Sequence, residues 1–441
     1  MTSKSPKRIK VITLGCSKNQ VDTSHLLAQL PAGEFVVVPE EAEEAVDVLM
    51  VNTCGFIGDA KEESVRTILE CAARKEQGLA GRLVVFGCLS QRYAAEMPGL
   101  IPEVDAWYGA RDLDPVLRDL GVQPSEALRT SRYALQPGLP YAYLKISEGC
   151  DRRCAYCAIP LIRGAHKSVP IPDLVREATE LARAGVKELI LIAQDTTYYG
   201  LDLYGRRALA DLLEALSGVG GIEWMRIHYS YPADFPEDVL DQMARNPKVC
   251  KYLDIPLQHI ADPVLDKMRR HVDGAWTRRL IETLRKRVPG VVLRTTMIVG
   301  HPGEGEAEFA QLLDFVRQAR FERLGAFQYS EEEDTYGALH YADDVPAEVK
   351  QARYDALMQV QAEISMDFNA SRVGSEERVL VDDWVDGTLV CRSQYESPEV
   401  DGEILVPCAE GKALVGQFVR VRITAAEEYD LRAELMPQVG P

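Results

Sequence analysis

The chain has 441 residues, 46% of them hydrophobic and 27% charged, with a formal net charge of −18. This length exceeds what one hydrophobic core usually organises, so we expect two or three domains. No stretch approaches the roughly 18 consecutive apolar residues of a membrane-spanning helix, and no signal-peptide core follows the basic start. We therefore expect a cytoplasmic protein that makes no membrane contact.

The charge balance and the cysteines narrow the kinds of partner and of chemistry that the protein can have. With 50 Lys and Arg against 68 Asp and Glu, the chain gains little from binding nucleic acid unless a local basic patch exists. A basic partner suits this charge better, although many cytosolic enzymes are acidic for solubility alone. Ten cysteines in a reducing compartment favour metal binding or catalysis over disulfides wherever their spacing is tight.

Residues 8–120 repeat one pattern three times. The apolar runs KVITLGC, AVDVLMVNTCG and RLVVFGC bring the chain to Cys16, Cys54 and Cys88, and amphipathic stretches lie between them. Strands that alternate with helices predict an open parallel α/β sheet. Because the carboxyl ends of parallel strands meet at one edge, we expect the three cysteines to lie together there, where open α/β sheets bind ligands.

Residues 136–373 carry six more apolar runs with helical stretches between them, which predict a partial (βα)6 barrel rather than a closed eight-stranded one. Polar residues at the carboxyl ends of barrel strands are typical of binding sites. The candidates of this kind are Gln194, Asp195, His228, Gln258, His259, Gln328 and Tyr329, and a Gly-His-Pro-Gly segment with Gly300 and His301 follows another of the apolar runs. The alternatives are a helix cap for Asp195, a structural hydrogen bond for His259 and a plain turn at Gly300.

Residues 375–441 form short strands punctuated by Gly and Pro, which predict a small all-β barrel of OB-like size. This segment has 14 Asp and Glu against 6 Lys and Arg, a net charge of −8. Such a barrel would repel RNA and attract a basic protein. Arg420 and Arg422 alternate on one strand face and are the candidate for a local basic patch.

Cys150, Cys154 and Cys157 follow directly on the predicted strand YLKIS, with three and two residues between them. Three thiolates on one loop can bind three irons of a four-iron cluster and leave the fourth iron open to a substrate or cofactor. Ferredoxin spacings supply a fourth cysteine, and a zinc knuckle needs four ligands, but no fourth ligand lies nearby in the sequence. The motif therefore predicts an iron–sulfur cluster with one open iron.

The motif CDRRCAYC after a strand resembles the signature of radical S-adenosylmethionine (SAM) enzymes. The blocks LGCSKN, VNTCGFI and FGCLSQRY resemble the three cysteine motifs of the methylthiotransferase family, and the resemblance covers nearly the whole chain. It implies an amino-terminal methylthiotransferase domain at 8–120, a radical SAM core at 136–373 and a substrate-binding TRAM domain at 375–441.

The resemblance also implies the cofactors, which are SAM and two [4Fe–4S] clusters. The cysteines that would hold the radical SAM cluster are Cys150, Cys154 and Cys157, and those of the auxiliary cluster are Cys16, Cys54 and Cys88. The residues that would bind SAM are Gln194, Asp195, Gln258, His259, Gly300 and His301. The other four cysteines, at 71, 250, 391 and 408, are expected to be buried structural residues.

Members of this family differ in substrate: some modify adenosines beside the tRNA anticodon, and others an aspartate on the twelfth protein of the small ribosomal subunit. The wording GCSKN, VNTCGFI and SEGCDRRC resembles the ribosomal-protein branch. The resemblance therefore implies methylthiolation of the β-carbon of that aspartate, with SAM as methyl donor and radical source. It also implies a basic ribosomal protein as partner, an electron donor such as a flavodoxin-type reductant, and no direct binding to nucleic acid.

Three alternatives stay open at this point. They are a tRNA adenosine methylthiotransferase, a radical SAM enzyme whose second cluster only conducts electrons, and an iron–sulfur sensor without enzymatic activity. Two further features are also open. Arg163 fits either a bidentate bond to a carboxylate or a surface salt bridge, and the acidic run at 331–334 fits a solvated loop better than a site.

Overall fold

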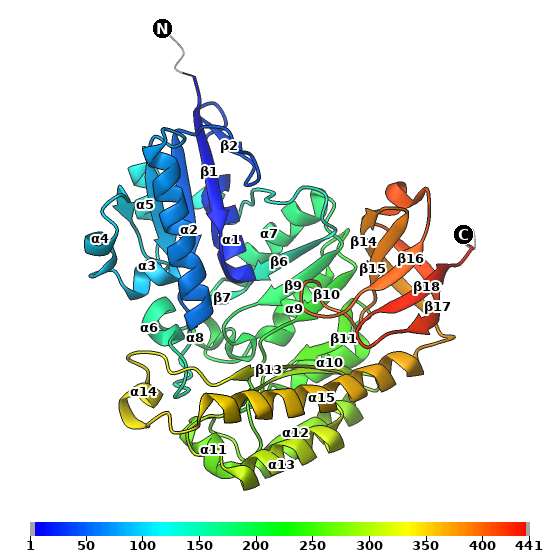
Figure 1. The fold of residues 1–441 in the computed structure, drawn as a ribbon. Helices are drawn as coiled ribbons and strands as arrows, with labels where there is room; N and C mark the ends of the chain where they lie inside the picture. Colours follow the sequence, from blue (N-terminus) through cyan, green and yellow to red (C-terminus); the bar gives the residue numbers. More distant parts are fainter. Residues whose placement is uncertain (1–4, 438–441) are drawn as a thin grey trace.

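The computed structural model describes residues 5–437, and the chain folds into three regions that follow one another along the sequence (Figure 1). Each region has its own sheet: an open sheet of five strands, an open sheet of six strands and a closed barrel of five. This arrangement agrees with the expected α/β fold class. No helix among the described residues is both long and apolar enough to cross a membrane.

The first region is a parallel sheet in the order β2-β1-β3-β4-β5, which confirms the expected open α/β sheet. Its strands are β1 (Lys7–Thr13), β2 (Phe35–Val38), β3 (Val48–Thr53), β4 (Leu83–Gly87) and β5 (Ala106–Trp107). Its helical segments are α1 (Ser17–Ala28), α2 (Gly58–Glu76), α3 (Cys88–Arg92), α4 (Met97–Leu100), α5 (Asp114–Asp119) and the 3-10 turn η1 (Glu126–Leu128).

Burial on both faces explains the apolar runs of this sheet. Strands β3 and β4 are buried along their whole length. Met50 packs in the same cluster as Leu26 of α1, whereas Leu49 packs with Ile68 of α2 on the opposite face. Parallel strands covered on both sides need apolar residues at successive positions, so their sequences show no alternation.

The second region is an open sheet of six parallel strands in the order β13-β12-β11-β10-β9-β6, which confirms the partial (βα)6 architecture. Its strands are β6 (Tyr141–Lys145), β9 (Glu188–Ile192), β10 (Trp224–Ile227), β11 (Val249–Asp254), β12 (Val292–Val299) and β13 (Arg323–Gln328). A separate pair, β7 (Ser147–Glu148) and β8 (Lys167–Ser168), frames the loop that follows β6.

Helices cover one face of this sheet and bury its largest apolar cluster, in which Leu189 and Leu191 of β9 pack with Leu213. The helical segments are α6 (Ile159–Arg163), α7 (Ile171–Arg183), η2 (Thr196–Tyr198), α8 (Leu201–Tyr204), α9 (Leu209–Ser217), α10 (Glu237–Arg245), α11 (Asp262–Lys267), α12 (Gly274–Arg287), α13 (Glu306–Ala319), α14 (Tyr336–His340) and α15 (Ala347–Ser371). The opposite face of the sheet carries charged residues, including Glu188 and Arg226.

The third region is a closed barrel in the order β14-β15-β16-β18-β17, which confirms the expected small OB-like barrel. Its elements are β14 (Glu376–Val385), β15 (Thr388–Arg392), β16 (Ile404–Pro407), the 3-10 turn η3 (Gly411–Leu414), β17 (Phe418–Ala426) and β18 (Leu431–Leu435). Strands β16 and β18 pair in parallel, and the other neighbours are antiparallel.

Helix α15 leads from the second region to the third and is held near both ends. Near its start, Lys350 contacts the loop after β12, and Arg353 donates to Glu304 Oε1 of the same loop at 2.9 Å. Near its end, Asn369 Nδ2 donates to the backbone carbonyl of Glu427 in the barrel at 3.0 Å. Figure 1 shows this helix extending toward the barrel.

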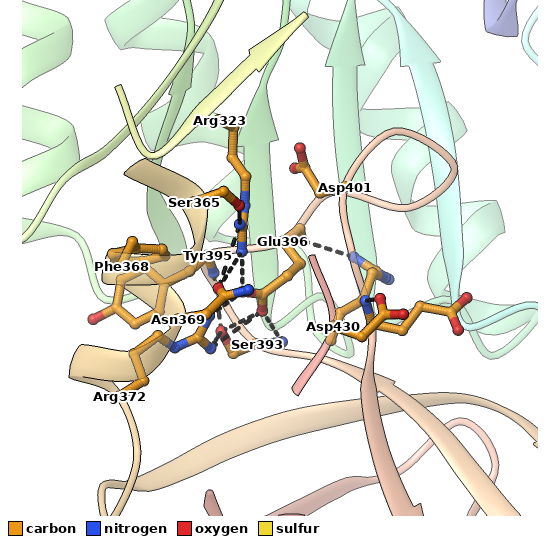
Figure 2. Close-up of polar contacts among 12 residues, drawn as sticks. Arg323, Ser365, Phe368, Asn369, Arg372, Ser393, Tyr395, Glu396, Asp401 and Asp430 are labelled. Carbon is orange, nitrogen blue, oxygen red and sulfur yellow. Dashed lines mark hydrogen bonds and ion pairs between the residues drawn. The ribbon is translucent and has the colours of Figure 1, made fainter. Parts of the chain in front are cut away.

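A buried carboxylate, Glu396, anchors the barrel to the second region (Figure 2). It lies in the loop between β15 and β16 and pairs with Arg323 of β13 at 3.1 Å and with Arg372, which directly follows α15. Ser393 Oγ donates to the same carboxylate at 2.7 Å. Burial alone would raise the pKa of Glu396, but the two guanidinium groups outweigh it and lower the pKa to about 2.

A second buried carboxylate, Glu188 at the start of β9, makes a parallel connection. It is fully buried and pairs with Arg226 of β10 and with Arg392 of the barrel, each at 2.7 Å. Arg392 also pairs with Asp382 of the barrel. Burial opposes the charge of Glu188, but Arg226 and Arg392 outweigh it and lower its pKa. The barrel is therefore held in part by buried ion pairs with the second region.

We expect Glu188→Gln to lower the free energy of unfolding by about 3–5 kcal/mol, because it leaves two buried guanidinium groups without their shared carboxylate. Denaturant unfolding monitored by circular dichroism measures this. The matched control is Glu223→Gln, which removes an exposed ion pair to Arg378 between the same two regions and should cost less than about 1 kcal/mol. Equal effects of the two variants would contradict the anchoring role of Glu188.

Candidate functional site

The loop that carries Cys150, Cys154 and Cys157 follows β6 and β7 at the carboxyl edge of the six-stranded sheet. The Cys157 N–H donates to the carbonyl of Cys154 at 3.1 Å, which folds the loop into a tight turn. Gly149 has φ +75°, and a Cβ there would lie 2.1 Å from the carbonyl oxygen of Ala165. Burial raises the pKa of Cys150 to about 12, and the nearby Cys154 thiol adds to this.

Cys16, Cys54 and Cys88 lie at the carboxyl ends of β1, β3 and β4, which are neighbours in the first sheet. Cys16 precedes the first residue of α1, and Cys88 is the first residue of α3. At Gly15 a Cβ would meet the Cys54 Cβ at 2.8 Å, so the loops approach closely. Burial and the Cys16 thiol both raise the pKa of Cys54. The structure thus brings the three predicted cysteines together.

Among residues 5–437, no three Cys, His, Asp or Glu side chains converge on a point where one metal ion could bind. A tetrahedral zinc site needs four ligands at about 2.0–2.3 Å from the metal. Thiolates of a four-iron cluster bind different irons and surround the cluster, so they need not converge.

One thiol of each group contacts a buried arginine. Arg270 donates to Cys154 Sγ at 3.4 Å, and Arg163 donates to Cys88 Sγ at 3.3 Å. Tyr231 Oη also lies 3.8 Å from Cys154 Sγ. Hydrogen bonds to cluster sulfurs are one of the means by which a protein tunes the potential of an iron–sulfur cluster.

Arg163 connects the two groups of cysteines. Its guanidinium donates to Asp22 at 2.7 Å and Asn19 at 2.6 Å in the first region, and to Glu148 at 3.0 Å, two residues before Cys150. It is 4% exposed, so the surface salt bridge considered from the sequence is wrong. Its partners are two different carboxylates, reached by a single guanidinium nitrogen.

The acidic run at 331–334 joins the first two regions. Glu332 is buried and pairs with Arg92 at 2.7 Å and Lys61 at 3.0 Å, both from the first region. Glu333 accepts a hydrogen bond from Tyr93 Oη at 3.0 Å. The expectation of a solvated loop is therefore wrong for Glu332, because its cationic partners lie about 240 or more residues earlier in the chain.

Gln194 and Asp195 follow β9, as expected, but differ in their partners. Asp195 accepts hydrogen bonds from the N–H and hydroxyl of Thr197 at 2.9 and 2.6 Å, which caps η2, and from Arg152 Nε at 2.8 Å. Gln194 Nε2 donates to Glu148 at 2.6 Å, whereas its Oε1 is buried without a partner among the described residues.

Gln258 and His259 follow β11 and also differ. The ring of His259 is fully buried, with Nδ1 accepting from the N–H of Ala261 at 3.1 Å and Nε2 facing Glu304 at 3.2 Å. Both ring nitrogens therefore have protein partners. Gln258 has φ +75°, and its Oε1 is buried with no partner within residues 5–437.

Gly300 and His301 form the turn after β12. Gly300 has φ +74°, and a Cβ would lie 2.4 Å from Lys350 Cγ of α15, so glycine is required on both counts. His301 Nδ1 lies 3.0 Å from the carbonyl of Pro302, and Nε2 is buried and unpartnered among the described residues. Burial lowers the pKa of His301 to about 4, so its ring is neutral.

Three family models match successive parts of the chain. They are described as the radical SAM superfamily at residues 144–316, the uncharacterized protein family UPF0004 at 8–109 and the TRAM domain at 373–436. The ribosomal protein uS12 methylthiotransferase RimO of Bacteroides fragilis is 49% identical over 430 residues, covering 98% of this chain and 99% of that protein. RimO of Porphyromonas gingivalis is 51% identical over 430 residues, covering 97% and 99%. The chain belongs to the RimO family of methylthiotransferases.

Solved structures share the fold of this RimO family member at low identity. The radical SAM methyltransferase TsrM from Kitasatospora setae has a TM-score of 0.57 at 13% identity, over 76% of this chain and 74% of that one. The cobalamin-dependent radical SAM enzyme OxsB has a TM-score of 0.52 at 12% identity, over 81% and 56%. At these identities the likeness concerns the fold alone.

Sequence reasoning missed several residues at the site of this RimO family member. Glu304 joins His259, the N–H of Gly300 and Arg353 through its two carboxylate oxygens. The sequence could have indicated Glu304, because it is the last residue of the block MIVGHPGE. Arg270 had no signal, because it lies 116 residues from Cys154 in the chain.

We expect His301 to make the unfolding of this protein sensitive to acid. The lowered folded-state pKa means that the unfolded chain binds the proton more readily between about pH 6.5 and 4, so stability falls as the pH falls through this range. Going from pH 7.5 to 5, wild type should lose about 2 kcal/mol more unfolding free energy than His301→Gln. Urea titrations at the two pH values measure this, and identical losses would contradict a buried neutral ring.

Proposed function

We propose that this chain attaches a methylthio group to the β-carbon of an aspartate of ribosomal protein uS12. One observation carries the proposal: two groups of three cysteines lie on facing sheet edges joined through Arg163, in a chain about half identical to RimO proteins over nearly its full length. Radical generation and sulfur delivery are distinct reactions, so each suits a cluster with its own open iron. The tRNA alternative is not favoured, because these relatives are named for uS12.

The chain's own residues would hold the cofactors as follows. Cys150, Cys154 and Cys157 would bind the radical SAM cluster, and the first group of cysteines the auxiliary cluster. When bound, the clusters and SAM would supply one-electron chemistry and the methyl group, while the protein would bind and orient them. Arg270 and Arg163 each donate to one cysteine sulfur and so stabilise its thiolate form.

Three of the six residues expected at the SAM site carry the buried atoms that a ligand would complete. They are Gln194 Oε1, Gln258 Oε1 and His301 Nε2, all without a partner in the described chain. Buried polar atoms are normally hydrogen-bonded, and all three can accept a hydrogen bond. The amino groups and ribose hydroxyls of SAM are donors of the matching kind. Asp195 and His259 would act by positioning the loops, and Gly300 by allowing close approach.

The proposed domains are the amino-terminal domain at 8–120, the radical SAM core at 136–373 and the TRAM domain at 375–441. The acidic TRAM barrel supports a basic protein substrate over RNA, and its Arg420 and Arg422 both pair with Glu376. An electron donor of the flavodoxin type would reduce the cluster. Because the substrate is a ribosomal protein, we place the reaction in the cytoplasm.

We expect mass spectrometry of ribosomal proteins to show one methylthio group on uS12 from cells that contain this chain and none from cells that lack it. tRNA nucleosides from the same cells serve as the internal comparison and should be unchanged. Loss of methylthioadenosine from tRNA, with uS12 unaffected, would overturn the proposed substrate.

The two groups of cysteines should fail differently when mutated. Cys154→Ala should abolish reductive cleavage of SAM to 5′-deoxyadenosine, whereas Cys54→Ala should keep cleavage but lose methylthiolation. Chromatography of 5′-deoxyadenosine and mass spectrometry of uS12 measure the two steps. Cys71→Ala, a buried cysteine on α2 outside both groups, is the control. Efficient product formation by Cys54→Ala would disprove the two-cluster assignment.

A further inference from the structure

Lys18 is a buried cation that the cofactor sites do not use. It lies in the first turn of α1, two residues after Cys16, and is only 8% exposed. Its ammonium stands 3.2 Å from the centre of the Tyr229 ring. Within residues 5–437 it has no hydrogen bond and no ion pair, which distinguishes it from Arg163, the buried cation on α6 of the second region.

The carboxylates nearest to Lys18 along its own helix and beside Tyr229 are already paired. Asp22, one turn further along α1, binds Lys145 and Arg163. Asp254 accepts the N–H of Tyr229 at 2.9 Å and pairs with Arg294 at 3.2 Å. An ammonium withdrawn from water without an anionic partner is costly, so this position is suited to an anion from outside the chain.

The surrounding backbone holds this position firmly. Tyr229 has φ +57°, a conformation that a tyrosine rarely adopts. Its N–H is held by Asp254, and its carbonyl accepts from the N–H of Thr196 at 3.1 Å. Such strained residues are concentrated at sites of function.

The contact between Lys18 and Tyr229 joins a segment beside one group of cysteines to a segment beside the other. Lys18 belongs to the loop and helix that start at Cys16. Tyr229 follows β10, two residues before Tyr231, whose hydroxyl lies 3.8 Å from Cys154 Sγ. Burial lowers the pKa of His228 well below its usual range, and the Lys18 ammonium is one of the cations that lower it further.

We infer that Lys18, supported by the Tyr229 ring, binds the side-chain carboxylate of the substrate aspartate. The inference rests on the proposed function. The carbon that receives the methylthio group is bonded directly to the carboxylate carbon. A cation that binds this carboxylate therefore also fixes the position of the reacting carbon, which is one bond away. The aromatic ring holds the ammonium in place and leaves its N–H groups free to donate. Fixing the reacting carbon between two cofactor sites is a positioning effect.

The test compares the wild-type holoenzyme with Lys18→Met on full-length uS12 and on uS12 whose target aspartate is replaced by asparagine. Lys18→Met should lower kcat/KM on native uS12 about 10- to 100-fold, mainly through KM. The decisive quantity is the preference for the aspartate over the asparagine substrate, which should be large for wild type and close to one for Lys18→Met. A merely structural role would lower both rates and leave the preference unchanged.

Two further variants complete the design. Lys18→Arg keeps the charge and should keep the preference for aspartate, with a reduced rate. Lys7→Met removes a lysine that lies 5.7 Å from the Phe35 ring at the opposite end of β1, and should leave both the rate and the preference as in wild type. Near-ultraviolet circular dichroism of each variant checks the packing.

The outcomes separate the two proposals. If wild type leaves uS12 unmodified, the proposed function fails. If wild type modifies uS12 but Lys18→Met keeps the full preference for aspartate, this inference fails. Equilibrium dialysis with SAM gives the remaining arm: Lys18→Met should bind SAM as wild type does, and a loss of SAM affinity would assign the ammonium to the SAM carboxylate and overturn the inference.

Discussion

The guanidinium of Arg163 lies where the carboxyl edges of two parallel sheets meet, and the geometry of the site depends on its pairing. A cation withdrawn from water must find anions, and Arg163 finds one on α1 of the first region and one at Glu148 beside the second group of cysteines. Removing either carboxylate would leave charge uncompensated. The ion pairs of Arg163 therefore hold the two sheet edges together, in addition to their shape complementarity.

The positions of the six cysteines followed from the sequence because parallel topology brings strand ends to one edge. A run such as RLVVFGC specifies both a buried strand and the residue that emerges from it. The closed barrel was equally predictable from short strands and frequent turns. The strands, their ends and the barrel depend on residues that are close together in the chain, so the sequence alone was sufficient to predict them.

The charged contacts between regions could not be predicted in the same way. Glu332 belongs to a run of four acidic residues that predicts a solvated loop. Its buried ion pair is with Arg92, which lies 240 residues away in the chain. Glu188 and Arg392 are 204 residues apart. Periodicity and spacing describe neighbours in the chain, whereas such pairs depend on how whole regions dock.

Helix α15 gives the molecule a mechanical property beyond its role as a connector. Its 25 residues span about 37 Å as one rigid rod. One end is fastened to the loop of Gly300 and Glu304, and the other to the barrel through Asn369 and the Glu396 cluster shown in Figure 2. Because α15 is rigid, a tilt at its carboxyl end also moves its amino end. A protein that binds to the barrel and displaces it would therefore also displace, through α15, the turn that carries His301.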